Sequence, residues 1–355
     1  MRGPLVIDIS GTQLREAERR RLAHPLVGMV ILFARNYESP AQLVQLCGEI
    51  HALRDPPLLI AVDHEGGRVQ RFRRGFTHIP PMSSFGRLWD RDVLGACRAA
   101  LAAGFVLGAE LRAHGVDMTF APVLDLDWAR SSVIGDRALH SDPRVVTLLA
   151  NQIGYGLALA GTSNCGKHFP GHGWALADSH TALPTDERTL EEIARADAAP
   201  YGWLGVGLDA VMLAHVVYPA VDRQAAGFSK RWIGEILRER LGFAGAVFSD
   251  DLSMQGARAA GDLPQSTRAA LAAGCDFAII CNDEVGVDRV LDELQWTPSR
   301  YFGERVERLV PRTGALPAAS PLRSERYAGA LRDLRLVQES AAQGAAGTNL
   351  QPARS

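Results

Sequence analysis

The chain has 355 residues, of which 47% are hydrophobic and 22% are charged, and its formal net charge is -2. This composition is that of an ordinary globular protein, and the small net charge excludes a bulk electrostatic field that would attract nucleic acid or an anionic membrane. The length allows one large barrel domain or two smaller domains.

The cysteines and the N-terminal sequence indicate the cellular compartment in which we expect the protein. The 5 cysteines are scattered and form no CxxC pair, so we expect neither a disulfide framework nor a zinc knuckle. The first apolar run soon meets Asp8 and lacks the length and cleavage site of a signal peptide, and no uninterrupted apolar segment is long enough to cross a bilayer. We therefore expect a protein of the reducing cytoplasm, with no membrane or nucleic-acid partner.

Short apolar runs alternate with helical patterns along most of the chain. The runs predict strands at 5–10, 27–33, 58–63, 116–122, 162–168, 208–215, 243–249 and 277–281. The patterns between them predict helices at 13–22, 40–53, 92–114, 143–160, 189–204, 229–240, 264–273 and 285–294, several of them after a capping residue such as Ser39, Asp142 or Ser229. The strands are continuously apolar rather than alternating, which is typical of parallel strands buried on both faces.

Strand–helix units in series predict an α/β fold, a (β/α)8 TIM barrel in a single domain with extra C-terminal helices. A doubly wound open sheet is the alternative, but it would usually carry a Gly-rich phosphate loop after its first strand, and none is found there. We assign residues 1–312 to the barrel, with a helix at 301–312. Residues 313–342 form a helical extension, with a helix at 323–342, and the Ala/Gly-rich tail 343–355 is expected to be disordered.

The most informative segment is Lys167–Gly173, followed shortly by Asp178, Ser179 and His180. Three histidines, a lysine and an aspartate fall within fourteen residues, where an apolar run gives way to a loop punctuated by Gly and Pro. A solvated loop is one interpretation. A functional site is the other, because loops on a rigid scaffold present titratable groups to ligands.

Other polar residues follow the predicted strands. In a barrel, catalytic groups gather at the carboxyl ends of the strands. The residues at these ends include Asp63 to Arg68 with Arg71, Asp125 and Asp127 with Asp136 and Arg137, Lys167 with His168, His215, Ser249 to Asp251, and Cys281 to Asp283. The barrel would bring this ring of side chains together at one point.

Two chemistries could use such a ring. A binuclear metal site could draw on Asp63, His64, Asp125, His168, His215 and Asp250, but the HExxH spacing is missing and nearby cations would repel a metal, so we expect no metal and no cofactor. Glycoside hydrolysis needs a carboxylate at the anomeric carbon and a proton donor for the leaving oxygen. Asp250 and Asp251 are candidate nucleophiles, and Asp178 could orient His180 for acid/base work.

At these residues the chain resembles glycoside hydrolase family 3, and within it the single-domain bacterial β-N-acetylglucosaminidases of peptidoglycan recycling. The matching stretches cover roughly residues 5 to 310 in family order, and Lys167–Gly173 is the most specific of them. The others are Asp63–Arg71, Phe120–Asp125, Ile134–Arg137, Asp178–His180 and Phe248–Met254.

The resemblance implies a retaining exo-glycosidase that forms a covalent glycosyl-aspartate. Asp250 would be the nucleophile, His180 the proton donor and acceptor, and Asp178 the group that orients His180. Sugar binding would fall to Asp63, Arg71, Arg137, Lys167 and His168. The substrate would be a small saccharide or muropeptide with terminal β-linked N-acetylglucosamine on an anhydro-N-acetylmuramyl residue, and the enzyme is expected to be a monomer.

Several alternatives stay open at this point. A β-glucosidase or an N-acetylglucosaminide phosphorylase would carry the same motifs, and a sugar-binding barrel without catalysis is an alternative of another class. Because adjacent strand residues face opposite ways, only one of Asp250 and Asp251 is expected to face the sugar. We also expect the 171–183 loop, with glycines at 171 and 173, to bend easily and close over the sugar.

Overall fold

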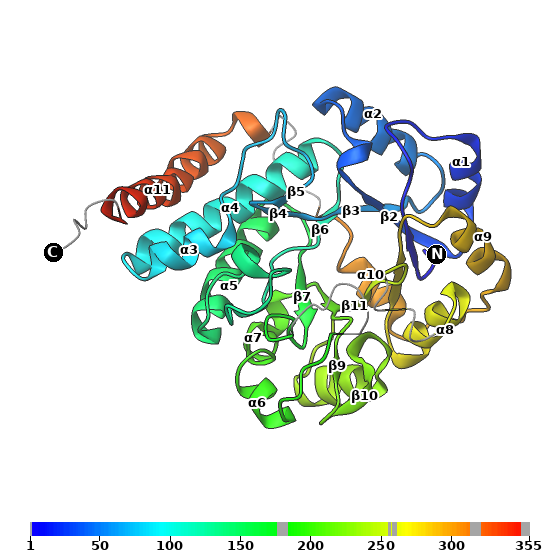
Figure 1. Cartoon of the computed structure of the whole chain (residues 1–355). Coiled ribbons are helices and arrows are strands. Elements are labelled where there is room, and N and C mark those ends of the chain that lie inside the picture. Colours follow the sequence, from blue (N-terminus) through cyan, green and yellow to red (C-terminus); the bar gives the residue numbers. More distant parts are fainter. Residues whose placement is uncertain (1, 176–183, 255–256, 258–260, 313–320, 349–355) are drawn as a thin grey trace.

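The computed structural model describes residues 2–175, 184–254, 257, 261–312 and 321–348. Its main sheet has 8 parallel strands in the order β6-β3-β2-β1-β12-β11-β8-β7. Figure 1 labels β2, β3, β6, β7 and β11 of this sheet. The strands are β1 (Leu5–Ile7), β2 (Val27–Leu32), β3 (Leu59–Val62), β6 (Met118–Thr119), β7 (Cys165–Phe169), β8 (Ala210–Leu213), β11 (Ala246–Asp251) and β12 (Phe277–Ile280). Parallel bridges from Met118 to Ser163 and from Val123 to Lys167 join the two edge strands, so the predicted barrel is confirmed.

Burial on both faces explains the continuously apolar strands. Along β1, Leu5 and Ile7 belong to the apolar layer under the helices, whereas Val6 belongs to the cluster inside the barrel. Phe120, Phe248 and Phe277 fill much of that interior. Because successive side chains point to opposite faces, every position of such a strand must be apolar.

Helices cover the outside of the barrel (Figure 1). They are α1 (Glu16–Ala23), α2 (Pro40–His51), α4 (Val93–Ala113), α5 (Pro143–Leu159), α6 (Leu190–Arg195), α7 (Ala199–Leu204), a π-helix (Arg231–Arg240), α8 (Leu263–Ala273) and α9 (Glu284–Glu293). The predicted caps are confirmed, because Ser39, Asp142 and Ser229 each accept a backbone N–H from the first turn, at 3.3, 2.8 and 3.0 Å.

Some short elements were not predicted. They are α3 (Met82–Trp89) and two antiparallel pairs, β4 (His64–Gly66) with β5 (Val69–Gln70) and β9 (Val217–Tyr218) with β10 (Asp222–Ala225). The helix predicted at 189–204 is divided into α6 and α7. Pro200 lies in the first turn of α7, where its missing N–H costs nothing, but it could not have continued α6.

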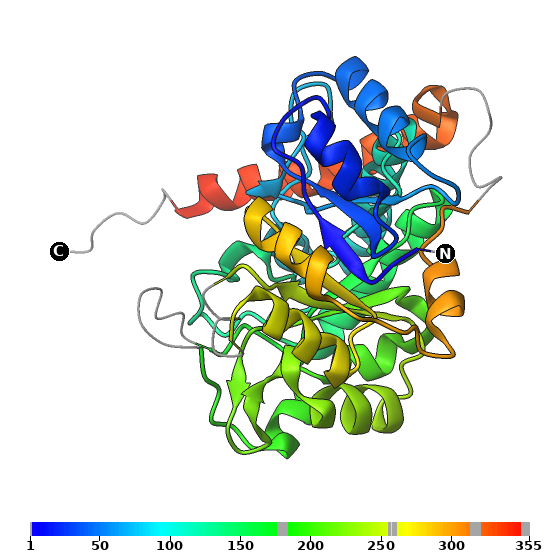
Figure 2. The same ribbon diagram turned by 90° about the vertical axis from the view of Figure 1, so that its right-hand side faces the viewer.

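The C-terminal part differs from the prediction in its boundaries. The helix expected at 301–312 is α10 (Phe302–Glu307), and the next is α11 (Glu325–Thr348). The helix α11 therefore continues past 342 into the segment that was expected to be disordered, because an Ala-rich sequence favours helix. It lies beside α3 and α4 (Figure 1), and its last turns extend beyond the barrel in Figure 2 as well.

Within the described residues, one helix, α4, is long and apolar enough to cross a membrane by length and composition alone. However, 72% of its most apolar window is buried inside the structure, mainly against α5 and α11. Such burial is the pattern of a core helix.

Candidate active site

A pocket of about 310 Å³ lies at the carboxyl ends of the strands. The described part of the chain includes six of the predicted site residues, and all six line this pocket: Asp63, Arg71, Arg137, Lys167, His168 and Asp250. The structure also places there Asp251, the second candidate nucleophile, and residues that were not assigned a role, among them Glu65, His172 and Met254.

Asp63 and Lys167 form the centre of the pocket. The Nζ of Lys167 donates to Asp63 Oδ1 at 2.7 Å, and Arg71 Nη2 donates to Asp63 Oδ2 at 3.1 Å. Burial alone would raise the pKa of Asp63, but the two cations outweigh burial and hold that pKa well below its usual value. Asp63 is therefore ionised and presents acceptor oxygens inside a buried site.

Glu65 is a buried carboxylate that sequence analysis missed as a site residue. It is 2% exposed, accepts two hydrogen bonds from Arg137 at 2.9 Å each, and lies 2.6 Å from Lys167 Nζ. Burial works to raise the pKa of Glu65, and Lys167 and Arg137 lower it overall. Its place in the Asp63–Arg71 motif was the one sequence signal that could have identified Glu65. The structural reason for its presence is that buried cations such as Lys167 and Arg137 require a buried anion.

His168 is held by a carboxylate behind it. Its Nδ1 lies 2.7 Å from Asp125 Oδ2, and the backbone N–H of His172 donates to Asp125 Oδ1 at 2.7 Å. Burial works to raise the pKa of Asp125, but His168 and His172 lower it to about 2. Asp125 thus orients His168 and leaves its Nε2 for the pocket.

The two candidate nucleophiles at the end of β11 both line the pocket, and which of them faces the sugar stays a prediction. Both reach the pocket because of a β-bulge, since the register of β11 against β12 shifts between Phe248 and Asp251. A second shift lies between Lys167 and Phe169 in β7, and it brings Lys167 and His168 to the same pocket.

The hydrogen bonds distinguish the two carboxylates. Asp251 accepts from the backbone N–H groups of Ser253 and Cys281 at 3.0 and 3.1 Å, and from the Ser253 hydroxyl at 2.8 Å. Burial raises the pKa of Asp251. Among the described residues, the only donor to Asp250 is the backbone N–H of Asp251, at 2.8 Å. Asp251 is engaged in holding the strand end, whereas Asp250 keeps oxygens available to a ligand.

Asp178 and His180 lie outside the described residues. The described flanks of their segment are packed. A Cβ on Gly173 would lie 2.0 Å from the carbonyl oxygen of Leu126, and Trp174 packs edge-on against Trp128. Close packing, not freedom to bend, therefore explains Gly173, and the movement predicted for 171–183 concerns residues outside the described part of the chain.

Some residues of the ring predicted at the strand ends pack against aromatic side chains instead of lining the pocket. His64 is fully buried between Phe72 and Phe76, and burial lowers its pKa to about 3, so it is neutral. His215 lies against the backbone carbonyl of Asp251 and stacks on Phe228. Across the described residues, no group of three or more His, Cys, Asp or Glu side chains is arranged to hold a metal ion.

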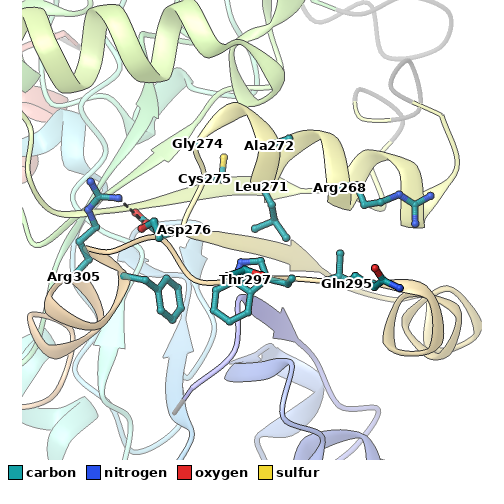
Figure 3. Close-up of a pocket in the computed structure, with 13 residues that line it drawn as sticks. Arg268, Leu271, Ala272, Gly274, Cys275, Asp276, Gln295, Thr297 and Arg305 are labelled. Atoms are coloured by element: carbon teal, nitrogen blue, oxygen red, sulfur yellow. Dashed lines mark hydrogen bonds and ion pairs between the residues drawn. The ribbon is translucent and has the colours of Figure 1, made fainter.

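A larger cavity, of about 460 Å³, lies at the opposite end of the barrel (Figure 3). It is bounded by the end of α8, the 294–302 segment and Arg305, which forms an ion pair with Asp276 at 2.8 Å, as Figure 3 shows. Asp276 precedes β12, so this cavity lies at the amino ends of the strands. Barrel enzymes carry their catalytic groups at the other end, so the smaller pocket is the candidate active site.

Comparison with known proteins identifies relatives over most of the chain. The family model described as glycosyl hydrolase family 3 N terminal domain matches residues 5–311. Proteins named beta-hexosaminidase from Bordetella avium and Thiobacillus denitrificans are 56% and 55% identical, and their alignments cover 93% of this chain and 94% and 92% of the relatives. NagZ from Neisseria gonorrhoeae in complex with N-trifluoroacetyl-D-glucosamine has a TM-score of 0.89 and 43% identity, covering 95% of this chain and 98% of that chain.

Proposed function

This chain belongs to glycosyl hydrolase family 3 and is a β-N-acetylhexosaminidase, and we propose that it releases terminal β-linked N-acetylglucosamine through a covalent bond to Asp250. The observation that carries the proposal is the difference between two neighbouring carboxylates in one pocket. Within the described residues, three donor groups bond to Asp251, whereas Asp250 accepts from the backbone N–H of Asp251 alone and is free to attack. A carboxylate nucleophile gives a glycosyl-aspartate and hence overall retention of configuration.

The buried charges around Asp63 supply the sugar-binding groups. The carboxylate of Asp63 can accept from sugar hydroxyls, while Lys167, Arg71 and His168 can donate to them. The Nε of Arg71 is buried and has no hydrogen-bond partner within the described residues, so it is a donor available to a ligand. Arg137 would act by holding Glu65 and, through it, Lys167. Such bonds are strong where water is excluded.

His180, oriented by Asp178, is the proposed acid and base. His180 would give its proton to the glycosidic oxygen as Asp250 attacks the anomeric carbon, and then take a proton from the water that displaces Asp250. The family resemblance supports these roles. The described pocket supports them indirectly, because the carboxylates of Asp63 and Glu65 are both paired with cations and kept ionised. An ionised carboxylate has no proton to donate.

The proposed substrate is N-acetylglucosamine linked to anhydro-N-acetylmuramic acid, with or without peptide, in the cytoplasm. The bound N-trifluoroacetyl-D-glucosamine of the Neisseria relative supports the N-acetyl preference. All five cysteines are free, which suits a reducing compartment. We propose a monomer.

Covalent trapping tests the proposal. Incubation with a 2-acetamido-2-deoxy-5-fluoro glycosyl fluoride should add one sugar to the intact mass, and peptide mapping should find it on Asp250. Label on Asp251 would overturn our choice of nucleophile.

Parallel assays on nitrophenyl N-acetyl-β-glucosaminide and β-glucoside, with and without phosphate, should show a preference for the first and no sugar 1-phosphate. A glucoside preference or phosphate-dependent turnover would favour the alternatives within the family.

The acid/base assignment has its own test. His180→Ala should slow glycosides with poor leaving groups far more than nitrophenyl glycosides, because nitrophenolate departs with little protonation. Equal slowing of both substrates would argue against His180 as the acid.

A further inference from the structure

Glu110 of α4 is a buried charged residue that the proposed mechanism does not use. It is 4% exposed, and its carboxylate accepts from the backbone N–H of Thr77 at 3.0 Å and from the Thr77 hydroxyl at 2.6 Å. The hydroxyl of Tyr327 donates to the same carboxylate. One buried anion therefore joins α4, the loop that contains Thr77, and α11.

Thr77 is tied closely to the residue before Arg71. The side-chain amide of Gln70 donates to the carbonyls of Phe72 and Thr77 at 3.2 and 2.9 Å, and its oxygen accepts the backbone N–H of Ile79 at 3.0 Å. Gln70 is 3% exposed, so these bonds are buried. Gln70 thus connects Thr77 and Ile79 to the turn that begins at Arg71.

Tyr327 reaches this network from outside the family match, which ends at 311. The helix α11 that carries it lies beside α3 and α4 (Figure 1). Its hydroxyl is also 3.3 Å from the Thr77 hydroxyl, and burial together with the hydrogen bond to Glu110 raises the pKa of Tyr327. Tyr327 is therefore a neutral donor that satisfies a buried carboxylate.

We propose that Tyr327 is a positioning residue for sugar binding, which acts through Glu110 and Thr77 on the loop that presents Arg71. The inference rests on the proposed role of Arg71 as a sugar ligand. Within the described residues, the Arg71 side chain donates one hydrogen bond, to Asp63, and lies over the Phe33 ring at 5.5 Å, and the backbone of its turn sets where it can make these contacts. Without the Tyr327 hydroxyl, the buried Glu110 side chain loses a donor, and the loop is less firmly fixed.

Steady-state kinetics on nitrophenyl N-acetyl-β-glucosaminide test the inference. We expect Tyr327→Phe to raise KM by about three- to tenfold while kcat changes by less than about twofold, the effect of losing one charged hydrogen bond that acts on binding. The matched control is Tyr155→Phe on α5, an exposed tyrosine that should leave KM unchanged. Melting temperatures should show that both variants are folded.

A double-mutant cycle with Arg71→Met then shows whether Tyr327 acts through Arg71. The KM of the double variant should equal that of Arg71→Met alone, since two residues of one network are not additive. Additive effects, or an unchanged KM in Tyr327→Phe while Arg71→Met raises KM, would overturn the inference and leave the proposed function intact. An unchanged KM in Arg71→Met would overturn the proposed role of Arg71, and the inference with it.

Discussion

The two adjacent carboxylates at the end of β11 differ in how the protein uses them, and their variants should differ as well. Asp250→Gly should lower kcat by at least about a thousandfold, because a nucleophile has been removed. Its melting temperature should stay near that of the parent, since Asp250 accepts a single backbone hydrogen bond from the described residues. Added azide should restore turnover and give a glycosyl azide of inverted configuration.

Asp251→Asn is the matched control for that prediction. It should melt at a lower temperature, because the amide cannot accept all the bonds that Asp251 receives from Ser253 and Cys281, yet it should keep measurable turnover. An inactive Asp251→Asn beside an active Asp250→Gly would reverse the assignment.

The buried carboxylate of Asp125 makes stability depend on pH. Its pKa in the folded protein is about 2, below the ordinary 3.8 of an unfolded chain. A carboxyl group whose pKa is lowered by folding stabilises the folded protein at pH values above its pKa in the unfolded chain. This contribution is lost as pH falls from about 4 towards about 2. Asp125→Asn should therefore be less stable than the parent at neutral pH, and the difference in free energy of unfolding should shrink towards about pH 3. Denaturant titrations would measure it, and a constant difference would contradict the prediction.

At the scale of single residues, sequence reasoning located the pocket but not all of its chemistry. Asp63, Lys167 and His168 were predictable because charged residues after apolar strands mark strand ends. Glu65 was missed because its partner Arg137 is distant in sequence. The bulge at Asp250 was missed because no glycine or other residue marks it.

At the scale of elements, the prediction was good where burial alone decides the structure. Each predicted strand is present, because a parallel strand covered on both faces must be apolar. The pairs β4–β5 and β9–β10 are too short to show a period. The helix α3 begins after Pro81 without a side-chain cap, so no capping residue marks its start.

The contact between α4 and α5 gives a sharper prediction. A Cβ on Gly156 would lie 2.2 Å from the carbonyl oxygen of Leu101, which is backbone and cannot move aside. Gly156→Ala should cost about 2 to 3 kcal/mol of stability through overpacking. The control is Gly48→Ala in α2, where nothing lies within 4 Å of the new methyl group, and where alanine should add up to about 1 kcal/mol. Denaturant unfolding of the two variants would decide, and similar stabilities would refute the packing argument.

At the scale of the whole molecule, the question is whether α11 unfolds with the barrel. The family match ends at 311, but α11 buries Ala330, Leu334 and Val337 in the apolar cluster that also lies under the barrel helices. Shared burial of this kind couples elements into one cooperative unit. We therefore propose that the helical extension and the barrel form one folding unit.

Leu334→Ala tests this coupling. Leu334 is 3% exposed, so its truncation should cost about 2 to 4 kcal/mol by leaving a cavity between α11 and the barrel helices. Because the extension and the barrel unfold together, the whole transition should move to lower denaturant, with catalytic activity and far-ultraviolet circular dichroism lost at one midpoint. The control is Leu94→Ala on α4, where a leucine that is 76% exposed should contribute little. The opposite result would be an early transition in Leu334→Ala that removes helical signal but leaves activity and the main midpoint unchanged. It would show that α11 is a separate appendage, and Tyr327 could then not hold the Arg71 loop in place.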